Sequence, residues 1–181
     1  MKTLTLLRHA KSTWDDPVAR DFDRPLNDRG RRAAQAVGRE MRKQELAFDH
    51  VIASPARRVI ETLADVSEGY GAPLQPAYDQ RLYLASTDIL LDVLHETRDD
   101  AGRLLVVGHN PGFERLVLTL TRSGGNGLRD QVEAKYPTAT LAEIVFAVEH
   151  WADVDEGMGR LTRFIRPRDL DPELGPDEDS F

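Results

Sequence analysis

Two histidines in this sequence each stand directly after a short apolar run that is typical of a buried β-strand. His9 follows residues 3–8, and His109 follows residues 103–108. In a sheet of mostly parallel strands, ligands bind beyond the carboxyl ends of the strands. We therefore expect both imidazoles to project from the same edge of one sheet.

A third segment brings an arginine toward the same edge. Residues 50–53 are typical of a strand, and Ser54-Pro55 is typical of a helix start, which places Arg58 on the first turns of that helix. Arg8 immediately precedes His9. A guanidinium fork matches phosphoryl oxygens, and helix N-termini favour anions. Together these residues indicate an anion site that suits a phosphoryl group.

The composition restricts the chemistry further. The 181 residues include 31 acidic and 24 basic side chains, for a net charge of −7, and no cysteine. An acidic chain has no general field that attracts nucleic acid or anionic membranes, so we expect neither as a partner. The lack of cysteine excludes disulfides, thiolate catalysis and cysteine-based zinc sites. No apolar stretch matches a signal peptide or a membrane span, so we expect a soluble, cytoplasmic protein.

Strands alternate with helices along the chain, which predicts an α/β sandwich around a mostly parallel sheet. Residues 140–149 and 159–166 alternate apolar and polar side chains and predict an antiparallel pair at one edge of that sheet. The expected helices run from Asn27 to about Glu45, from Ser54-Pro55 to near Gly69, from Ser86 or Thr87 to before Gly102, from Asn110-Pro111 to about Thr121, and over 128–136.

The chain length suits one domain. We expect a single domain over residues 1–167 and a flexible, acidic tail over 168–181, where proline and acidic residues dominate. Residues 10–26 are polar and predict a loop, and residues 123–127 predict a glycine-rich turn.

Four motifs follow one another in an order that matches a known family. Residues 7–12 (LRHAKS) resemble an Arg-His-Gly signature, with Ala10 in the glycine position. The next three motifs are residues 23–30 (DRPLNDRG), residues 54–62 (SPARRVIET) and residues 106–112 (VVGHNPG). The ordered set resembles the histidine phosphatase superfamily, which includes the phosphoglycerate mutases. The last motif is similar to that of the SixA-type phosphohistidine phosphatases.

The resemblance implies a three-layer α/β/α sandwich of the phosphoglycerate mutase-like kind and a phosphatase that needs no metal or other cofactor. His9 would be the nucleophile that forms a phosphohistidine. Arg8 and Arg58 would bind the phosphoryl oxygens. His109 would be a third, positive partner, and Ser12 would add a neutral hydrogen bond. The partner would be a phosphorylated small molecule or a protein that carries phosphohistidine, and the oligomeric state stays open.

The proton donor of the family has no clear counterpart in this sequence. Asp79 is the nearest candidate by position, and Glu61, Asp88 and Asp92 are weaker candidates. An alkyl phosphate needs a proton on its leaving group, whereas a phosphoramidate such as phosphohistidine leaves more readily. The missing donor therefore favours phosphohistidine or another activated substrate.

Three other functions stay open from the sequence. The first is a phosphoglycerate-type mutase, which the short stretch between Arg58 and His109 disfavours. The second is a phosphate-binding or phosphoprotein-binding module with weak turnover, which the uncertain proton donor keeps open. The third is a metallohydrolase in which His9, His109 and nearby aspartates bind a metal ion.

Overall fold

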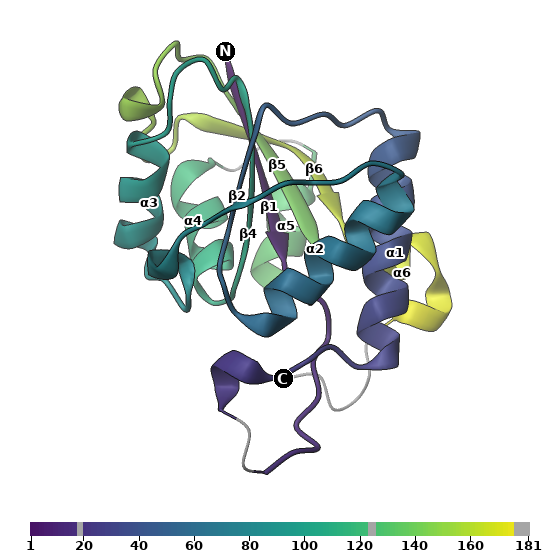
Figure 1. Ribbon diagram of the computed structural model, residues 1–181. Helices are drawn as coiled ribbons and strands as arrows, with labels where there is room; N and C mark the ends of the chain where they lie inside the picture. The colour runs from purple at the N-terminus through teal and green to yellow at the C-terminus, as the bar shows by residue number, and fades with distance from the viewer. Residues whose placement is uncertain (18–19, 123–125, 176–181) are drawn as a thin grey trace.

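The computed structural model describes residues 1–17, 20–122 and 126–175, and its centre is a six-stranded sheet (Figure 1). The strands lie in the order β3-β2-β4-β1-β5-β6. Their bounds are Lys2–Arg8 for β1, His50–Ala53 for β2, Ala77–Tyr78 for β3, Arg103–Gly108 for β4, Leu141–Phe146 for β5 and Gly159–Ile165 for β6.

All but one of these strands run in the same direction. β4 pairs in parallel with β1 and with β2, and β2 pairs in parallel with β3. β5 runs antiparallel to both β1 and the edge strand β6. The predicted mostly parallel sheet and the antiparallel pair at its edge are confirmed, and the reversed strand lies one place in from that edge.

Helices cover both faces of the sheet, so the fold has three layers (Figure 1). One face packs against α1 (Asp28–Lys43), α2 (Arg57–Tyr70) and α6 (Pro167–Leu170). The other face packs against α3 (Thr87–His95), α4 (Gly112–Leu120) and α5 (Leu128–Ala134). Short 3-10 turns connect some of these elements, at Asp21–Asp23, Gln80–Leu82, Trp151–Asp153 and Pro172–Leu174.

The central strands send alternate side chains into the two cores. In β4, Leu104 and Val106 pack into one core, whereas Leu105 and Val107 pack into the other. A strand that is covered on both faces has apolar residues at consecutive positions. This is why residues 103–108 were recognisable in the sequence as a buried strand.

Helices α1 and α2 approach each other closely because glycines lie where they cross. A Cβ atom added at Gly38 would lie 2.1 Å from the carbonyl oxygen of Val66, and one added at Gly69 would lie 2.1 Å from that of Gln35. The two backbones therefore meet without side chains between them. This contact fixes α2, the helix that carries Arg58, firmly against α1.

Two of the predicted helix starts lie too early. α2 begins at Arg57 rather than at Pro55, and α4 begins at Gly112, after a cis Asn110-Pro111 peptide bond. Ser54 is fully buried, and its hydroxyl contacts His109 as well as the backbone N–H of Ala56. The cap predicted at Ser54 is thus wrong, because this hydroxyl belongs to a polar cluster at the edge of the sheet.

The caps predicted for two other helices are confirmed. Asn27 accepts a hydrogen bond from the backbone N–H of Gly30 at 2.8 Å and so caps α1. Ser86 accepts one from the N–H of Ile89 at 3.4 Å at the start of α3. Within the described ranges, no helix combines the length and apolar character that a membrane crossing requires.

The first part of the predicted C-terminal tail packs against the domain. Pro167–Leu170 form α6, and the side chains of Leu170 and Leu174 pack against the core between the sheet and α1. Arg29 of α1 also donates a hydrogen bond to the carbonyl oxygen of Gly175. Residues 168–175 therefore contact the domain through two leucines and one backbone carbonyl, and the flexibility of the tail stays a prediction. Residues 176–181, and residues 123–125 of the predicted turn, lie outside the described residues.

Candidate active site

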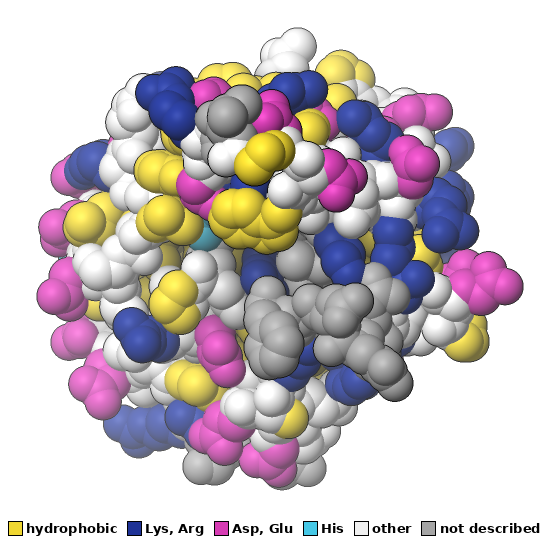
Figure 2. All heavy atoms as spheres, turned by 90° about the horizontal axis from the view of Figure 1, so that it is seen from below, with side chains coloured by type: hydrophobic (Ala, Val, Ile, Leu, Met, Phe, Trp, Pro, Cys, Tyr) yellow, Lys and Arg dark blue, Asp and Glu magenta, His cyan; other side chains and the backbone are white. Residues whose placement is uncertain are grey.

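The two histidines singled out in the sequence lie side by side at the carboxyl edge of the sheet. Arg8 ends β1 opposite Gly108 of β4, and the backbone N–H of His9 donates to the Gly108 carbonyl oxygen at 3.0 Å. The ring centroids of His9 and His109 are 5.3 Å apart, with an interplanar angle of 56°. Figure 2 looks onto this edge and shows part of a histidine side chain in a depression, between hydrophobic and basic side chains.

His9 is buried, and its ring has a defined tautomer. Its Nδ1 lies 2.7 Å from the carbonyl oxygen of Ala10. A carbonyl oxygen only accepts, so Nδ1 carries the proton and, in the neutral ring, Nε2 carries the lone pair. Burial holds the pKa of His9 well below its usual value, and the positive charge of Arg8 acts in the same direction. The imidazole is therefore neutral at physiological pH.

Arg8 extends from the end of β1 to the segment after α5. Its Nη1 donates to the carbonyl oxygen of Tyr136 at 2.8 Å, and the buried Tyr136 hydroxyl donates to Leu6 at 2.7 Å. Burial lowers the pKa of Arg8 to about 10, so the guanidinium stays charged at neutral pH. Its Nε–H is buried and has no hydrogen-bond partner.

Arg58 lies in the first turn of α2 and is only 2% exposed. Its Nη1 donates to the backbone carbonyl of Asp21 at 2.6 Å, and its Nη2 donates to Oδ2 of Asp21 at 3.0 Å. Nη2 also lies 3.3 Å from Nδ1 of His109. As in Arg8, the Nε–H of Arg58 is buried without a partner.

These two N–H groups share an unusual property. Over residues 1–17, 20–122 and 126–175, the buried side-chain N–H groups that lack a partner are the Nε–H of Arg8 and the Nε–H of Arg58. A buried donor without an acceptor is costly, and such groups in native proteins call for an explanation. Both belong to the arginines that the sequence predicted to bind phosphoryl oxygens.

His109 lies between Arg58 and Ser54 and is 3% exposed. Its Nε2 is 2.8 Å from the hydroxyl oxygen of Ser54. Arg58 only donates, so Nδ1 accepts and the ring proton lies on Nε2, which donates to Ser54. Burial lowers the pKa of His109 to about 3, and the charge of Arg58 contributes. In the ligand-free protein His109 is therefore neutral at pH 7, in contrast to the predicted positive partner.

Asp21 and Tyr83 complete the polar cluster, and the sequence had not singled out either residue. Tyr83 donates its hydroxyl proton to Oδ2 of Asp21, and Arg24 donates to Oδ1 at 3.1 Å. Burial alone would raise the pKa of Asp21, but the hydrogen bond from Tyr83 and the charge of Arg58 outweigh it and lower this pKa. The Tyr83 ring meets the His109 ring edge-on, with centroids 5.5 Å apart.

Comparisons with known proteins agree with this arrangement. A family model for the histidine phosphatase superfamily (branch 1) matches residues 4–83, which include both His9 and Arg58. A solved SixA-like protein from Nakamurella multipartitia is 32% identical, with a TM-score of 0.78 over 92% of this chain and 96% of that chain. The chain belongs to the histidine phosphatase superfamily.

A further relative and a further solved structure are also similar to this histidine phosphatase. An uncharacterized protein of Mycobacterium tuberculosis is 37% identical over 164 residues, which is 90% of this chain and 100% of the relative. The protein histidine phosphatase SixA, solved with tungstate, has a TM-score of 0.75 at 19% identity, over 93% of this chain and 99% of that chain. At that identity the likeness shows the fold, which is the predicted phosphoglycerate mutase-like sandwich. The protein is thus a phosphatase, and its class is that of hydrolases.

The position of Asp79 in this histidine phosphatase does not suit a proton donor. Its carboxylate accepts the backbone N–H of Arg81 at 2.9 Å and Nη2 of the same arginine at 2.8 Å. The hydrogen bond from the Arg81 side chain lowers the pKa of Asp79. Arg81 also pairs with Glu96 at 2.8 Å. Asp79 is therefore a charged carboxylate in an ion-pair network, and the tentative assignment of Asp79 as proton donor is not supported by its contacts.

The weaker candidates occupy other places. Asp88 and Asp92 are exposed on α3, and Asp88 lines a separate groove with Thr87 and Arg115. Both carboxylate oxygens of Glu61 already accept hydrogen bonds, one of them from Arg57 at 2.7 Å. The residues considered in the sequence thus include no carboxyl group that is both free and at the two histidines.

Metal binding was one of the open alternatives for this site. Within the described ranges, no group of three or more His, Asp or Glu side chains is arranged to hold a metal ion. One nitrogen of each imidazole is committed to the protein, that of His9 to Ala10 and that of His109 to Ser54. The described residues thus offer no three-ligand group for the metallohydrolase alternative, and independence of metal ions stays a prediction.

Proposed function

We propose that this phosphatase transfers a phosphoryl group to Nε2 of His9 and then to water, without a metal ion. The observation that carries the proposal is the tautomer of His9, whose Nδ1–H is held by the Ala10 carbonyl at 2.7 Å. That hydrogen bond leaves the lone pair on Nε2, which is the form of imidazole that attacks phosphorus. The lowered pKa of His9 supports the same form at neutral pH.

Arg8 and Arg58 are the residues proposed to bind the phosphoryl oxygens. Each contributes one buried Nε–H that has no partner in the ligand-free protein. Phosphoryl transfer depends mainly on alignment and on neutralising the charge of the oxygens, and two guanidinium groups supply both. Ser12 forms a β-bridge with Leu26 beside this site, and its proposed role stays a neutral hydrogen bond.

His109 is proposed to change its charge when substrate binds. In the ligand-free protein it is neutral, with Nδ1 toward Arg58 and Nε2–H toward Ser54. A phosphoryl dianion beside the ring favours the imidazolium, because an opposite charge within a few ångströms raises the pKa of a histidine. Protonated Nδ1 no longer accepts from Arg58, so it is proposed to donate to the transferred group as its third partner while Nε2–H stays on Ser54.

The reaction has two steps. In the first, Nε2 of His9 forms a bond to phosphorus while the bond to the leaving group breaks, and the leaving group takes a proton from solvent water. In the second, water attacks phosphorus, the N–P bond breaks with its electron pair returning to Nε2, and the attacking water releases one proton to solvent as inorganic phosphate leaves. Asp79 and Glu61 are both committed to arginines, which favours substrates whose leaving groups need little help. We therefore propose phosphohistidine in a protein, or a small activated phosphate, as the substrate.

Turnover of three substrate classes tests this proposal. We expect phosphohistidine and an aryl phosphate to be hydrolysed, and an alkyl phosphate to be slower by about 100-fold, which is a typical contribution of a general acid. Equal turnover of the alkyl phosphate would contradict the proposed substrate. Binding of inorganic phosphate without turnover of any substrate would point to a phosphate-binding module instead.

A further inference from the structure

Residues 10–17 and 20–26, which directly follow His9, are called here the catalytic loop, and their first and last residues lie close together. Ser12 and Leu26 form an isolated antiparallel β-bridge. The N–H of Thr13 donates to Pro25 at 3.0 Å, and the N–H of Asn27 donates to Lys11 at 3.0 Å. The two ends of the loop are therefore adjacent.

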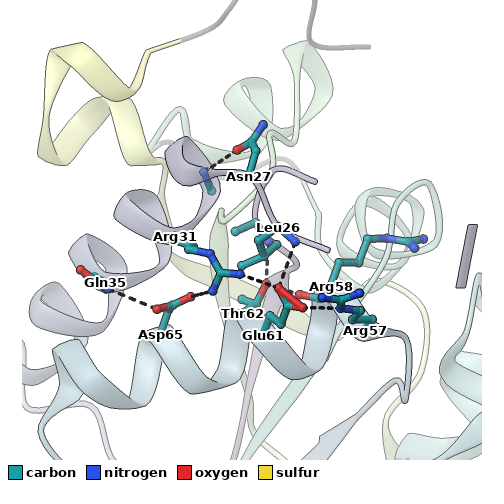
Figure 3. A network of polar contacts seen from close by, with 11 residues as sticks. Leu26, Asn27, Arg31, Gln35, Arg57, Arg58, Glu61, Thr62 and Asp65 are labelled. Atoms are coloured by element: carbon teal, nitrogen blue, oxygen red, sulfur yellow. Dashed lines mark hydrogen bonds and ion pairs between the residues drawn. The ribbon is translucent and has the colours of Figure 1, made fainter. Parts of the chain in front are cut away.

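Two neighbouring residues of α2 hold these two ends (Figure 3). Thr62 accepts the backbone N–H of Ala10 at 2.9 Å and donates to the carbonyl oxygen of Arg58 at 2.6 Å. Glu61 accepts the backbone N–H of Leu26 at 3.2 Å. Two consecutive side chains of α2, the helix that carries Arg58, thus accept hydrogen bonds from the two ends of the loop.

Glu61 joins more than these two elements. Its Oε1 also accepts from Arg31 of α1 at 2.9 Å, and its Oε2 accepts from Arg57 at 2.7 Å. Figure 3 shows the carboxylate between these guanidinium groups and the Leu26 backbone. Leu26 itself is 4% exposed and packs in the core beside α1 and α2. One carboxylate therefore fixes α1, α2 and the end of the catalytic loop to one another.

The position of the loop matters because its middle contacts the phosphate-binding arginine. Asp21 accepts from both Nη atoms of Arg58, at 2.6 and 3.0 Å. Arg58 lies one turn before Glu61 on the same helix. Any shift of the loop relative to α2 therefore moves Asp21 against Arg58 and changes which of its N–H groups are free for a ligand.

We propose that Glu61 is a positioning residue for phosphoryl binding, which acts by holding the base of the catalytic loop on α2 and thereby orienting Arg58 through Asp21. The proposal rests on the proposed role of Arg58 in binding the phosphoryl group. In this proposal, Glu61 acts through the length of its side chain, which lets it accept the hydrogen bond from Leu26, and not through its charge. The ion pairs of Glu61 involve Arg31 and Arg57, whose side chains are 44% and 56% exposed, and exposed pairs contribute little.

Two substitutions at this position separate reach from charge. Glu61→Gln keeps the length and an acceptor oxygen for the Leu26 N–H, whereas Glu61→Asp keeps the charge but shortens the side chain by one methylene. Affinity for inorganic phosphate by calorimetry, and kcat and KM with an aryl phosphate, are the readouts. We expect Glu61→Asp to weaken phosphate binding and raise KM by about tenfold, with kcat retained. Glu61→Gln should stay within about threefold of the wild type.

Asp65→Asn is the matched control, since Asp65 lies one turn further along α2. It accepts from Gln35 at 3.2 Å and pairs with Arg31 at 3.6 Å. It therefore shares the contact with α1 but, among the contacts described, none with the catalytic loop. Thermal unfolding of each variant shows whether it folds, and Asp65→Asn should lose stability without a change in phosphate affinity.

Several results would overturn the proposal. They are wild-type phosphate affinity in Glu61→Asp, equal impairment in Glu61→Gln, or the same loss of affinity in Asp65→Asn. A fall in kcat with unchanged KM would instead make Glu61 part of the chemistry. The proposed function is judged separately: a wild-type protein that binds phosphate but forms no phosphoenzyme would contradict that function and leave the Glu61 comparison valid.

Discussion

Arg58 donates a hydrogen bond from Nη2 to Nδ1 of His109, over 3.3 Å. Because a guanidinium group has no acceptor, this contact makes Nδ1 the acceptor and assigns the ring proton to Nε2. Together with burial, it keeps the second histidine of the site neutral before substrate binds. The ligand-free site is therefore two neutral imidazoles between two charged arginines, and its measurable properties follow from that distribution of charge.

The neutral state of His109 predicts that acid weakens the fold. Its pKa is about 3 in the folded protein against 6.5 normally, so the unfolded chain takes up the proton first as the pH falls. The stabilisation is complete above about pH 6.5 and is lost as the pH falls toward 3. Between pH 7 and pH 5, we expect His109 to account for a fall of about 2 kcal/mol in the free energy of unfolding.

Urea unfolding of the wild type and of His109→Gln at pH 7 and pH 5 measures this fall in the free energy of unfolding. The variant should lack the part that His109 contributes. His150→Gln is the control, because the hydrogen bond that its Nδ1–H donates to Asp99 raises the pKa of His150 in the folded protein. His150 thus stabilises the fold below its unfolded pKa, and this stabilisation is lost as the pH rises. The pH dependence is therefore opposite to that of His109. The same acid sensitivity in His109→Gln as in the wild type would show that His109 is not held neutral.

Ser54→Ala tests the orientation of His109. The substitution removes the acceptor of the Nε2–H and leaves this buried group unpaired, at a cost of about 1–3 kcal/mol. We expect kcat/KM with an aryl phosphate to fall about tenfold as the ring loses its fixed position. Ser86→Ala, which removes only the cap of α3, should leave kcat/KM unchanged. Equal activity of the two variants would argue against a role for Ser54 in the site.

Asp79→Asn tests whether the ion-paired aspartate supplies a proton. Because its carboxylate is held by Arg81 and its pKa is lowered, we expect kcat/KM to remain within about threefold of wild type for aryl and alkyl phosphates alike. The diagnostic comparison is between the two leaving groups. A loss confined to the alkyl phosphate would identify Asp79 as the proton donor after all.

Removal of metal ions should leave the activity unchanged. The proposed chemistry uses two arginines where other phosphatases use metal ions to neutralise the phosphoryl oxygens. Hydrolysis of an aryl phosphate before and after dialysis against EDTA is the measurement. If activity disappears with EDTA and returns with an added divalent cation, the proposed mechanism is wrong.

The sequence predicted the part of the site that local patterns encode. Apolar runs locate the ends of β1 and β4, so the proximity of His9 and His109 follows once the strands are taken as parallel. Arg58 follows β2 by the same logic, even though its helix begins later than predicted. The resemblance to the family rested in addition on the order of the four motifs along the chain, which cannot be seen from any one strand or helix.

The contacts that tune the site could not be predicted in this way. Asp21 lies in a polar loop that also contains Asp15, Asp16 and Asp23, and no periodicity distinguishes the one that folds back onto Arg58. Ser54 resembled an ordinary helix cap in the sequence because the donor that its hydroxyl oxygen binds instead, His109, is distant in sequence. The state of each side chain thus depends on long-range packing, and this explains both the misplaced cap and the neutral His109.

The central claim is that His9 carries the phosphoryl group, and trapping the phosphoenzyme tests it most directly. The enzyme is mixed briefly with a ³²P-labelled aryl phosphate, denatured, and divided between acid and base. We expect label on the protein that is stable in base and lost in acid, as for a phosphoramidate, and no label in His9→Ala. His95→Ala should retain the label, because it changes a histidine at the end of α3 that contacts only the carbonyl oxygen of Val154 among the hydrogen bonds described. An equal phosphoenzyme signal in His9→Ala would contradict the account.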